Sequence, residues 1–284
     1  MELVLSMSRV AKLLIVLTFS AHSVKILIKL VFLLSEIVQG KNEMIIQLTS
    51  IGNIPAILWG NASNRLYLYV HGQGGNKEEA SFLAEKICPH GWQVLSFDLP
   101  EHGDRKDEND SFNPWHIVPE LNLVMQYVKS HWKQCSLYAT SIGAWFSVLS
   151  FGQENIATSL FVSPVLDMKQ LILKMMCWAS VTEEQLCSEK IIPTSFGQTL
   201  TWDYWQYAVN HPILVWNSPT RILYGEYDNM IDYSSIEDFS KKYHCATTVM
   251  EHGEHWFHTK QQMDFLGSWI SNNFQTEKAI EIEQ

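Results

Sequence analysis

From residue 44 onward, short apolar runs alternate with amphipathic segments along the chain. Apolar runs bounded by Gly, Asn, Asp or Pro are typical of buried strands, whereas apolar residues that recur every three or four positions predict helices. We expect strands over 44–48, 54–59, 66–70, 92–97, 135–139, 156–162, 221–224 and 246–250. We expect helices over 78–87, 115–132, 144–149, 166–179, 235–243 and 263–274. The first two strands predict an antiparallel hairpin, and the later alternation predicts a parallel sheet with right-handed crossovers.

The alternation stops between residues 165 and 213. This segment combines a predicted helix, an acidic pair and an aromatic stretch, and we interpret it as a cap inserted over the carboxyl edge of the sheet. Aromatic side chains at helical spacing are usually core, so its aromatic residues are expected to pack the cap onto the sheet. The functional alternative is that some of them line an apolar acyl pocket, and the candidates are Trp178, Trp202 and Trp205.

Residues 1–43 differ from the domain predicted over 44–284. Arg9 and Lys12 precede an apolar run, and a small-x-small triplet at 21–23 resembles the cleavage site of a secretory signal. A membrane anchor is the second alternative, although Lys25 and Lys29 near its middle would each cost roughly 2.5–3.5 kcal/mol on insertion. The third is an upstream extension that is absent from the working protein.

Composition restricts the class of protein. The chain has 284 residues, 46% of them hydrophobic, and a formal net charge of -10. One sizeable α/β domain fits these values, and the acidic body argues against nucleic acid or an anionic membrane surface as a partner. Five scattered cysteines without a C-x-x-C pair favour reduced thiols in the cytoplasm and no zinc site. Membrane contact is expected only through residues 1–43.

The stretch 139–143, Ala-Thr-Ser-Ile-Gly, is the strongest candidate for chemistry. It lies between a predicted strand and a predicted helix, with Ser141 at the apex and a small residue two positions away on each side. This is the nucleophile-elbow pattern G-x-S-x-G with Ala139 in the first glycine position. A helix N-cap serine is the alternative interpretation.

A serine nucleophile also needs donors for the oxyanion. The glycine-rich loop 71–75 directly follows a predicted strand, and the backbone N–H groups of Gln73 and Ile142 are the candidate donors. A phosphate-binding loop is disfavoured, because no G-K-[ST] follows.

A carboxylate that orients the base is expected in the loop 225–231. Loops at the carboxyl ends of parallel strands meet at one edge of the sheet, and this loop follows such a strand. Asp228 is the best placed, with Glu226 and Asp232 as competitors.

The base is expected in the loop 252–258, which contains three histidines. His255 is the candidate, because it lies in the loop just before the last predicted helix. His252 and His258 are interpreted as surface or cap-contacting residues. A metal site is the alternative, but the loop has no H-E-x-x-H motif and no further ligand at a standard spacing.

With Ser141, Asp228 and His255 in this order, residues 44–274 resemble the α/β-hydrolases of the serine esterase, lipase and aminopeptidase-like kind. The segment 98–103, D-L-P-E-H-G, resembles their D-x-x-G-H-G loop, with Glu101 in place of the first glycine. The resemblance implies a mostly parallel twisted sheet flanked by helices, with a helical cap between the sixth and seventh strands.

The resemblance also implies hydrolysis of a small or medium apolar acyl ester through an acyl-enzyme on Ser141, without a cofactor. Within this fold the alternatives are a thioesterase, a serine aminopeptidase and a lipase acting on monoacylglycerol. A non-catalytic binding protein of the same fold is the alternative from a different class.

Overall fold

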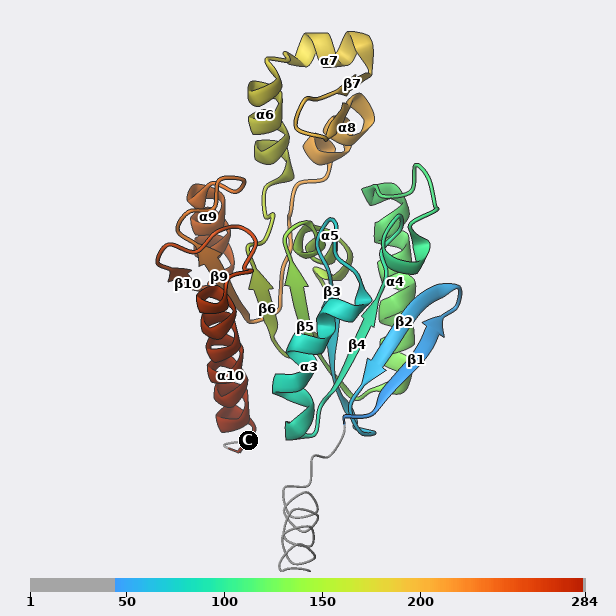
Figure 1. Cartoon of the computed structure of the whole chain (residues 1–284), viewed down its shortest axis with the longest axis vertical. Helices are drawn as coiled ribbons and strands as arrows, with labels where there is room; N and C mark the ends of the chain where they lie inside the picture. Colours follow the sequence, from blue (N-terminus) through green and yellow to red (C-terminus); the bar gives the residue numbers. More distant parts are fainter. Residues whose placement is uncertain (1–43, 283–284) are drawn as a thin grey trace, which may run out of the picture. The chain divides into compact units, whose positions relative to one another are not determined.

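The apolar runs pair into one sheet in the computed structural model, which describes residues 44–282 and their side chains as far as Phe274. The sheet has eight strands in the order β1-β2-β4-β3-β5-β6-β9-β10 (Figure 1). Only the pairings of β2 with β1 and β4 are antiparallel. The strands are β1 (Ile46–Ile51), β2 (Ile54–Trp59), β3 (Arg65–Val70), β4 (Gln93–Phe97), β5 (Gln134–Thr140), β6 (Ser159–Val162), β9 (Thr220–Gly225) and β10 (Ala246–Met250). The predicted hairpin and parallel sheet are therefore confirmed.

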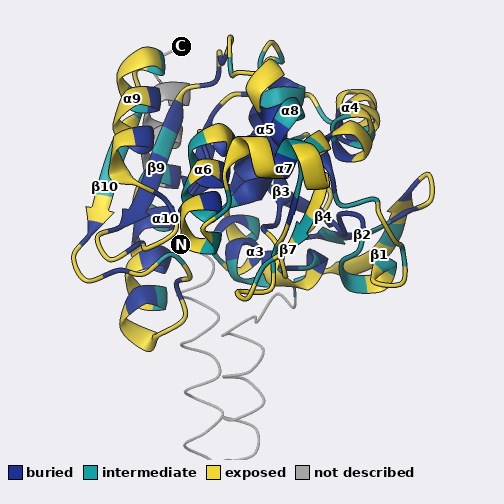
Figure 2. Cartoon of the chain, turned by 90° about the horizontal axis from the view of Figure 1, so that it is seen from above, coloured by how far each residue is buried: buried dark blue, intermediate teal, exposed yellow. Residues whose placement is uncertain are grey.

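Helices cover both faces of the sheet. The helices α4 (Pro114–His131), α5 (Ile142–Phe151) and α9 (Tyr233–Tyr243) pack with one apolar cluster, and α3 (Ser81–Ile87) and α10 (Lys260–Ile282) pack with the other. Seen from above, the buried strands lie between the two layers of helices (Figure 2). Each layer buries an apolar stripe that would otherwise face water, which is the main stabilising contribution of this architecture.

The residues of β3 alternate between these two clusters. Leu66 and Leu68 belong to the cluster that contains α4 and α5, whereas Tyr67 and Tyr69 belong to the cluster of α3 and α10. This follows from the period of two in a strand, in which successive side chains point to opposite faces. The face covered by α3 and α10 is consequently the more aromatic one around β3.

The helix predicted over 78–87 forms in two parts. A short 3-10 turn, η1 (Lys77–Ala80), precedes α3, and the side chain of Asn76 accepts a hydrogen bond from the N–H of Glu78. An asparagine in this position satisfies a donor that the turn itself leaves free. The turn brings the side chains of η1 to the carboxyl ends of β3 and β4, at the edge where a site is expected.

Between β6 and β9 the chain forms α6 (Met168–Ala179), α7 (Glu183–Glu189), β7 (Ile191–Pro193), β8 (Thr199–Thr201) and α8 (Trp202–Asn210). These elements lie beyond the carboxyl ends of β5 and β6 (Figure 1). The small β7–β8 hairpin was not predicted, because strands of three residues are too short to show alternation. Tyr204 of α8 stacks on Trp145 of α5 with ring centroids 5.9 Å apart, so aromatic contacts join this segment to the helices below it.

Within the described residues, no helix is both long enough and apolar enough to cross a membrane. The three alternatives for residues 1–43 lie outside the described part of the chain.

Candidate active site

Ser141 occupies a strained turn between β5 and α5. Its backbone angles are φ 49° and ψ −125°, a region that residues other than glycine rarely adopt. The turn is tightly packed: a Cβ on Gly72 would lie 3.0 Å from the Cβ of Ser141, and one on Gly143 would clash with the carbonyl oxygens of His71 and Val70. The small residues around Ser141 are thus required by close backbone approach.

Replacing Gly143 with alanine is expected to destabilise the protein by about 1–3 kcal/mol, because an added methyl group in this packed turn must displace backbone. Thermal unfolding followed by circular dichroism measures the loss. Gly267→Ala is the control, since a Cβ there meets mainly the flexible end of Lys86 and the ring of Phe82. An equal melting temperature for the Gly143→Ala variant and the wild type would show that the turn is looser than its geometry indicates.

The hydroxyl of Ser141 does not cap α5. Although Ser141 is the N-cap residue, its side chain makes no capping hydrogen bond. Its Oγ lies instead 3.0 Å from Nε2 of His255, in the loop before α10. This distance is within the range of a hydrogen bond that passes a proton from a nucleophile to a base. The N-cap interpretation of Ser141 therefore does not describe the structure.

The imidazole of His255 is held from its other side by Asp228. The Nδ1 atom of His255 lies 2.6 Å from Oδ2 of Asp228. The Oδ1 atom of Asp228 accepts the N–H groups of Met230 and Ile231, both at 2.9 Å. The carboxylate is completely buried, so its orientation is fixed by these three hydrogen bonds. An ionised acceptor at Nδ1 leaves Nε2 free to accept the proton of Ser141.

The competing residues of the two loops have other partners. Glu226 accepts the backbone N–H of His252 at 2.8 Å. Asp232 forms an ion pair with Lys174 of α6 at 2.6 Å. Both His252 and His258 are exposed, and Nδ1 of His258 lies 2.8 Å from the carbonyl oxygen of Trp256. Of the candidates in these loops, the structure brings only Asp228 and His255 to Ser141.

The glycine-rich loop 71–75 is held by the loop that follows β4. The N–H of Gly74 donates to Nε2 of His102 at 2.9 Å, and Nε2 of buried His71 accepts the N–H of Leu99 at 3.0 Å. The N–H groups of Gln73 and Ile142 have no acceptor among the described residues. Two free donors beside a serine hydroxyl are what an oxyanion site requires.

Glu101 occupies the position of the first glycine in the D-x-x-G-H-G pattern, and its contacts explain this difference. Glu101 adopts a φ of 64°, which explains why glycine suits this position. Its carboxylate accepts the N–H groups of Ser111 and Phe112 at 2.6 and 2.9 Å. These two hydrogen bonds anchor the loop before α4, so the glutamate offsets the conformational cost with contacts that glycine lacks.

The buried His71 predicts a dependence of stability on pH. Burial lowers the pKa of its imidazole from 6.5 to about 4. The unfolded chain then binds more protons than the folded protein between these values, so the free energy of unfolding falls as the pH is lowered from about 6.5 to 4. The loss is roughly 3 kcal/mol for the full shift. Urea titrations between about pH 4 and 6.5 measure this free energy, and it should change less with pH in His71→Gln than in the wild type. An equal change in both proteins would contradict the lowered pKa of His71.

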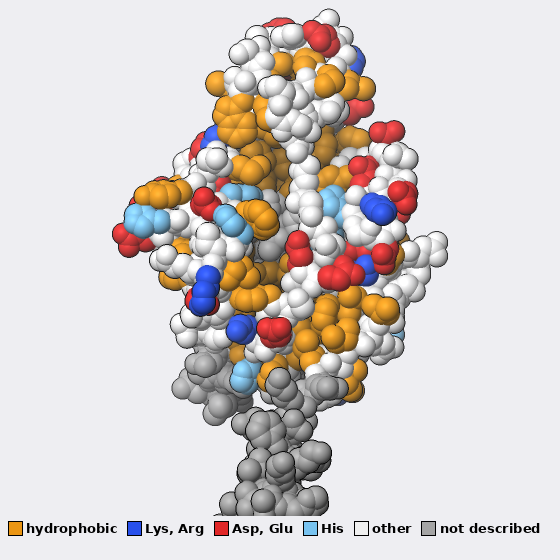
Figure 3. Space-filling view, viewed as in Figure 1, with side chains coloured by type: hydrophobic (Ala, Val, Ile, Leu, Met, Phe, Trp, Pro, Cys, Tyr) orange, Lys and Arg blue, Asp and Glu red, His pale blue; other side chains and the backbone are white. Residues whose placement is uncertain are grey.

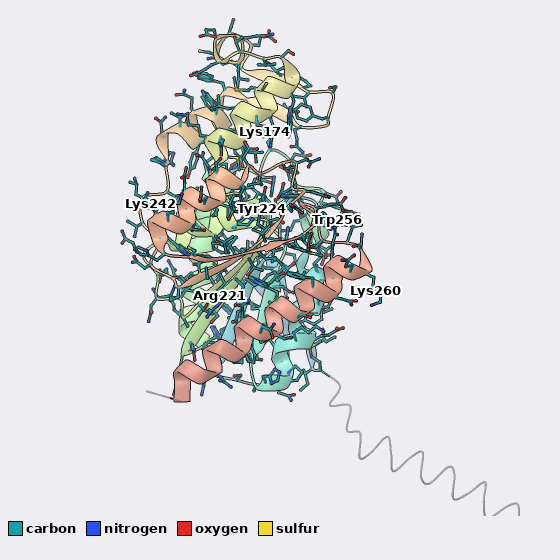
Figure 4. The ribbon with its side chains drawn as sticks, turned by 90° about the vertical axis from the view of Figure 1, so that its left-hand side faces the viewer. Lys174, Arg221, Tyr224, Lys242, Trp256 and Lys260 are labelled. Atoms are coloured by element: carbon teal, nitrogen blue, oxygen red, sulfur yellow. The ribbon has the colours of Figure 1, made fainter. Side chains whose placement is uncertain are left out.

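A cavity of about 500 Å³ opens beside Ser141 and His255. Figure 3 shows hydrophobic side chains gathered around a hollow in this face of the molecule. The cavity extends to the side of the sheet covered by α3 and α10, and Trp256 in the loop before α10 contributes to its wall (Figure 4). Its wall includes side chains from β3, η1, α3, β5 and α10, among them Tyr69, Glu79, Phe82, Tyr138 and Met263.

The three tryptophan candidates for substrate contact do not line this cavity. Trp205 is buried in the cluster with α5, and Trp178 is 47% exposed and packs against Phe196 between β7 and β8. Trp202 lies under the ammonium of Lys190, 5.1 Å from the ring centroid. The acyl-pocket interpretation is therefore corrected: Trp205 packs with the core, Trp178 with Phe196 and Trp202 with Lys190, because the hydrophobic effect buries apolar area without selecting the surface that covers it.

Sequence reasoning missed the residues that do line the cavity. Tyr69 and Tyr138 lie in predicted strands, where they are typical core residues, and Glu79 lies off the apolar face of the helix predicted over 78–87. The alternation of leucine and tyrosine in β3 is the one available signal, because it places Tyr69 on the same face as Tyr67. The distance between η1 and β5 is not encoded in any local pattern.

A metal site was the alternative interpretation of the histidine-rich loop 252–258. In the described part of the chain, no group of three or more His, Cys, Asp or Glu side chains is placed to hold a metal ion.

The fold is similar to those of known esterases and hydrolases. Est1E from Butyrivibrio proteoclasticus with bound ferulic acid has a TM-score of 0.64 at 17% identity, over 82% of this chain and 99% of that chain. A putative hydrolase from Agrobacterium vitis has a TM-score of 0.66 at 13% identity, over 82% and 98%. Mouse alpha/beta hydrolase domain-containing protein 10 has a TM-score of 0.65 at 13% identity, over 82% and 99%. No protein-family model and no curated protein sequence matches the chain. The structural likeness confirms the α/β-hydrolase fold.

Proposed function

We propose, on the premise that this chain has the α/β-hydrolase fold, that it is a serine hydrolase that cleaves a carboxylic ester through an acyl-enzyme on Ser141. The single observation that supports this most strongly is the hydrogen-bonded chain from Ser141 through His255 to Asp228, which opens onto a cavity. A strained serine conformation beside free backbone donors supports it further.

In the proposed mechanism, Nε2 of His255 takes the proton of Ser141 as Oγ attacks the ester carbonyl. The N–H groups of Gln73 and Ile142 stabilise the oxyanion of the tetrahedral intermediate. The intermediate collapses, the C–O bond to the alcohol breaks, and the proton on His255 passes to the leaving alcohol. A water molecule then gives a proton to His255 and attacks the acyl-enzyme, which releases the acid and restores Ser141.

An ester is the proposed substrate class, because the structures of similar fold include an esterase from Pyrococcus furiosus. A thioester needs the same serine chemistry, so a thioesterase remains the alternative within this fold. The substrate is expected to be small enough for a cavity of about 500 Å³.

Labelling with a fluorophosphonate tests this proposal, since such probes react with serines activated by a base. We expect the wild type to be labelled at Ser141 and to hydrolyse para-nitrophenyl butyrate, and the Ser141→Ala variant to do neither. Ser150→Ala is the matched control, because this serine lies on α5 and donates to the carbonyl oxygen of Phe146. An unlabelled wild type would indicate a non-catalytic binding protein, and labelling that survives in Ser141→Ala would refute the assigned nucleophile.

A further inference from the structure

A carboxylate stands in the wall of the cavity beside Ser141. The side chain of Glu79, in η1, lines the cavity, and its Oε2 accepts the phenolic O–H of Tyr69 at 3.4 Å. A Cβ on Gly75 would lie 2.7 Å from this oxygen, so the carboxylate adjoins the loop that carries Gln73. Glu79 is therefore close to the reacting centre without belonging to the chain of hydrogen bonds through His255.

Two tyrosines form an aromatic wall next to Glu79. Tyr69 and Tyr138 are paired in register on β3 and β5, and their rings stack with centroids 5.3 Å apart and an angle of 10°. Burial raises the pKa of both phenols, so they stay neutral donors. The hydroxyl of Tyr138 has no hydrogen-bond partner among the described residues. The rest of the wall is largely apolar: Phe82, Leu83, Val162, Phe257, Met263 and Leu266.

The carboxylate of Glu79 has no counter-charge in the described part of the chain. The ammonium of nearby Lys77 forms ion pairs with the carboxylates of Asp98 and Asp104, at 2.7 and 2.8 Å. Lys86 lies over the ring of Phe82, 5.5 Å from its centroid. Partial desolvation raises the pKa of Glu79, although the residue as a whole is exposed. A ligand with a positive charge would supply the missing partner.

We propose that this cavity binds a protonated amine carried on an apolar body, with the ammonium at Glu79 and the apolar part against Tyr69 and Tyr138. The carboxylate attracts the ammonium by its charge, and the apolar surface of the two tyrosines and their neighbours buries the apolar body. The inference builds on the proposed function and specifies its substrate class as an amine-bearing ester. It replaces the expectation of a purely apolar acyl group.

Calorimetric titration of the full chain with hexylammonium chloride and, separately, hexan-1-ol tests the proposal without relying on catalysis. The two probes have the same apolar body and differ in charge at neutral pH. We expect the wild type to bind hexylammonium about tenfold more tightly than hexanol. Glu79→Gln keeps the shape and an acceptor oxygen, and should remove most of this preference. Glu85→Gln removes an equal charge from the exposed side of α3 and should preserve it.

Equal binding of the two probes to the wild type would overturn the proposal, as would a preference that survives in Glu79→Gln. Inhibition of para-nitrophenyl butyrate hydrolysis tests whether the amine binds in the cavity beside Ser141. We expect competitive inhibition by hexylammonium, and non-competitive inhibition would show that the amine binds outside this cavity. Fluorophosphonate labelling of Glu79→Gln shows that the variant is folded and keeps an activated Ser141. If the wild type binds the amine but is neither labelled nor active, only the proposed hydrolysis fails.

Discussion

Ser141→Ala is expected to lower kcat/KM for para-nitrophenyl butyrate by at least about 10³-fold. The physical reason is that, among the described residues, no other hydroxyl is hydrogen-bonded to Nε2 of His255, so the covalent step has no substitute. Initial rates at substrate concentrations well below KM measure the effect directly. The residual rate reports the contribution of the oxyanion donors and of substrate binding alone.

Two controls separate loss of the nucleophile from loss of the fold. The melting temperature of Ser141→Ala should stay close to that of the wild type, because alanine fits the same turn. Ser150→Ala should retain its activity within about twofold, as a surface-type change away from the site does. A variant lacking Ser141 that keeps more than a tenth of the activity would place the nucleophile elsewhere.

The second large effect is expected for Asp228→Asn, with kcat reduced by about 10³- to 10⁴-fold. The asparagine oxygen can still accept the N–H groups of Met230 and Ile231, so the loop should keep its shape. Its amide N–H₂ would then face Nδ1 of His255 and donate to it. The proton of the neutral imidazole would move to Nε2, where it blocks proton transfer from Ser141.

Asp232→Asn is the matched control for this change. It alters the same type of side chain in a neighbouring position, where the carboxylate pairs with Lys174 and lies outside the hydrogen-bonded chain. We expect its kcat to remain within about twofold of the wild type. Equal decreases in kcat for the two variants would mean that the loss of a negative charge, and not the tautomer of His255, lowers the rate.

The local pattern of apolar and polar residues predicts much of the fold. The apolar runs that became β3, β4, β5 and β9 are short and bounded by turn residues, so their number and order were predictable. The pairing of Ser141 with His255 followed from a topological rule, because loops at the carboxyl ends of parallel strands share one edge. The extent of α10 and the split into η1 and α3 depend on tertiary packing, which a local pattern does not contain.

The cavity shows the limit of such reasoning most clearly. An aromatic-rich insertion suggested Trp178, Trp202 and Trp205, yet none of these side chains lines the cavity beside Ser141. A hydrophobic side chain in the sequence predicts burial, but it does not predict which surface will cover it, because the hydrophobic effect is non-directional. Side chains on β3, η1 and β5 contribute to the wall instead, and Tyr138 on β5 follows Tyr69 on β3 by 69 residues in the sequence.

Local sequence pattern is enough to predict the strand–turn–helix around Ser141, the loops that hold Asp228 and His255, and the sheet that brings them to one edge. These features follow from periodicity, small residues in tight turns and the rules of parallel sheets. Only the tertiary structure decided which carboxylate and which histidine meet, and that Glu79 lies beside the tyrosine pair. The reason is physical: hydrogen-bond partners and cavity walls depend on distances of a few ångströms between segments, and these distances are set by packing of the whole domain.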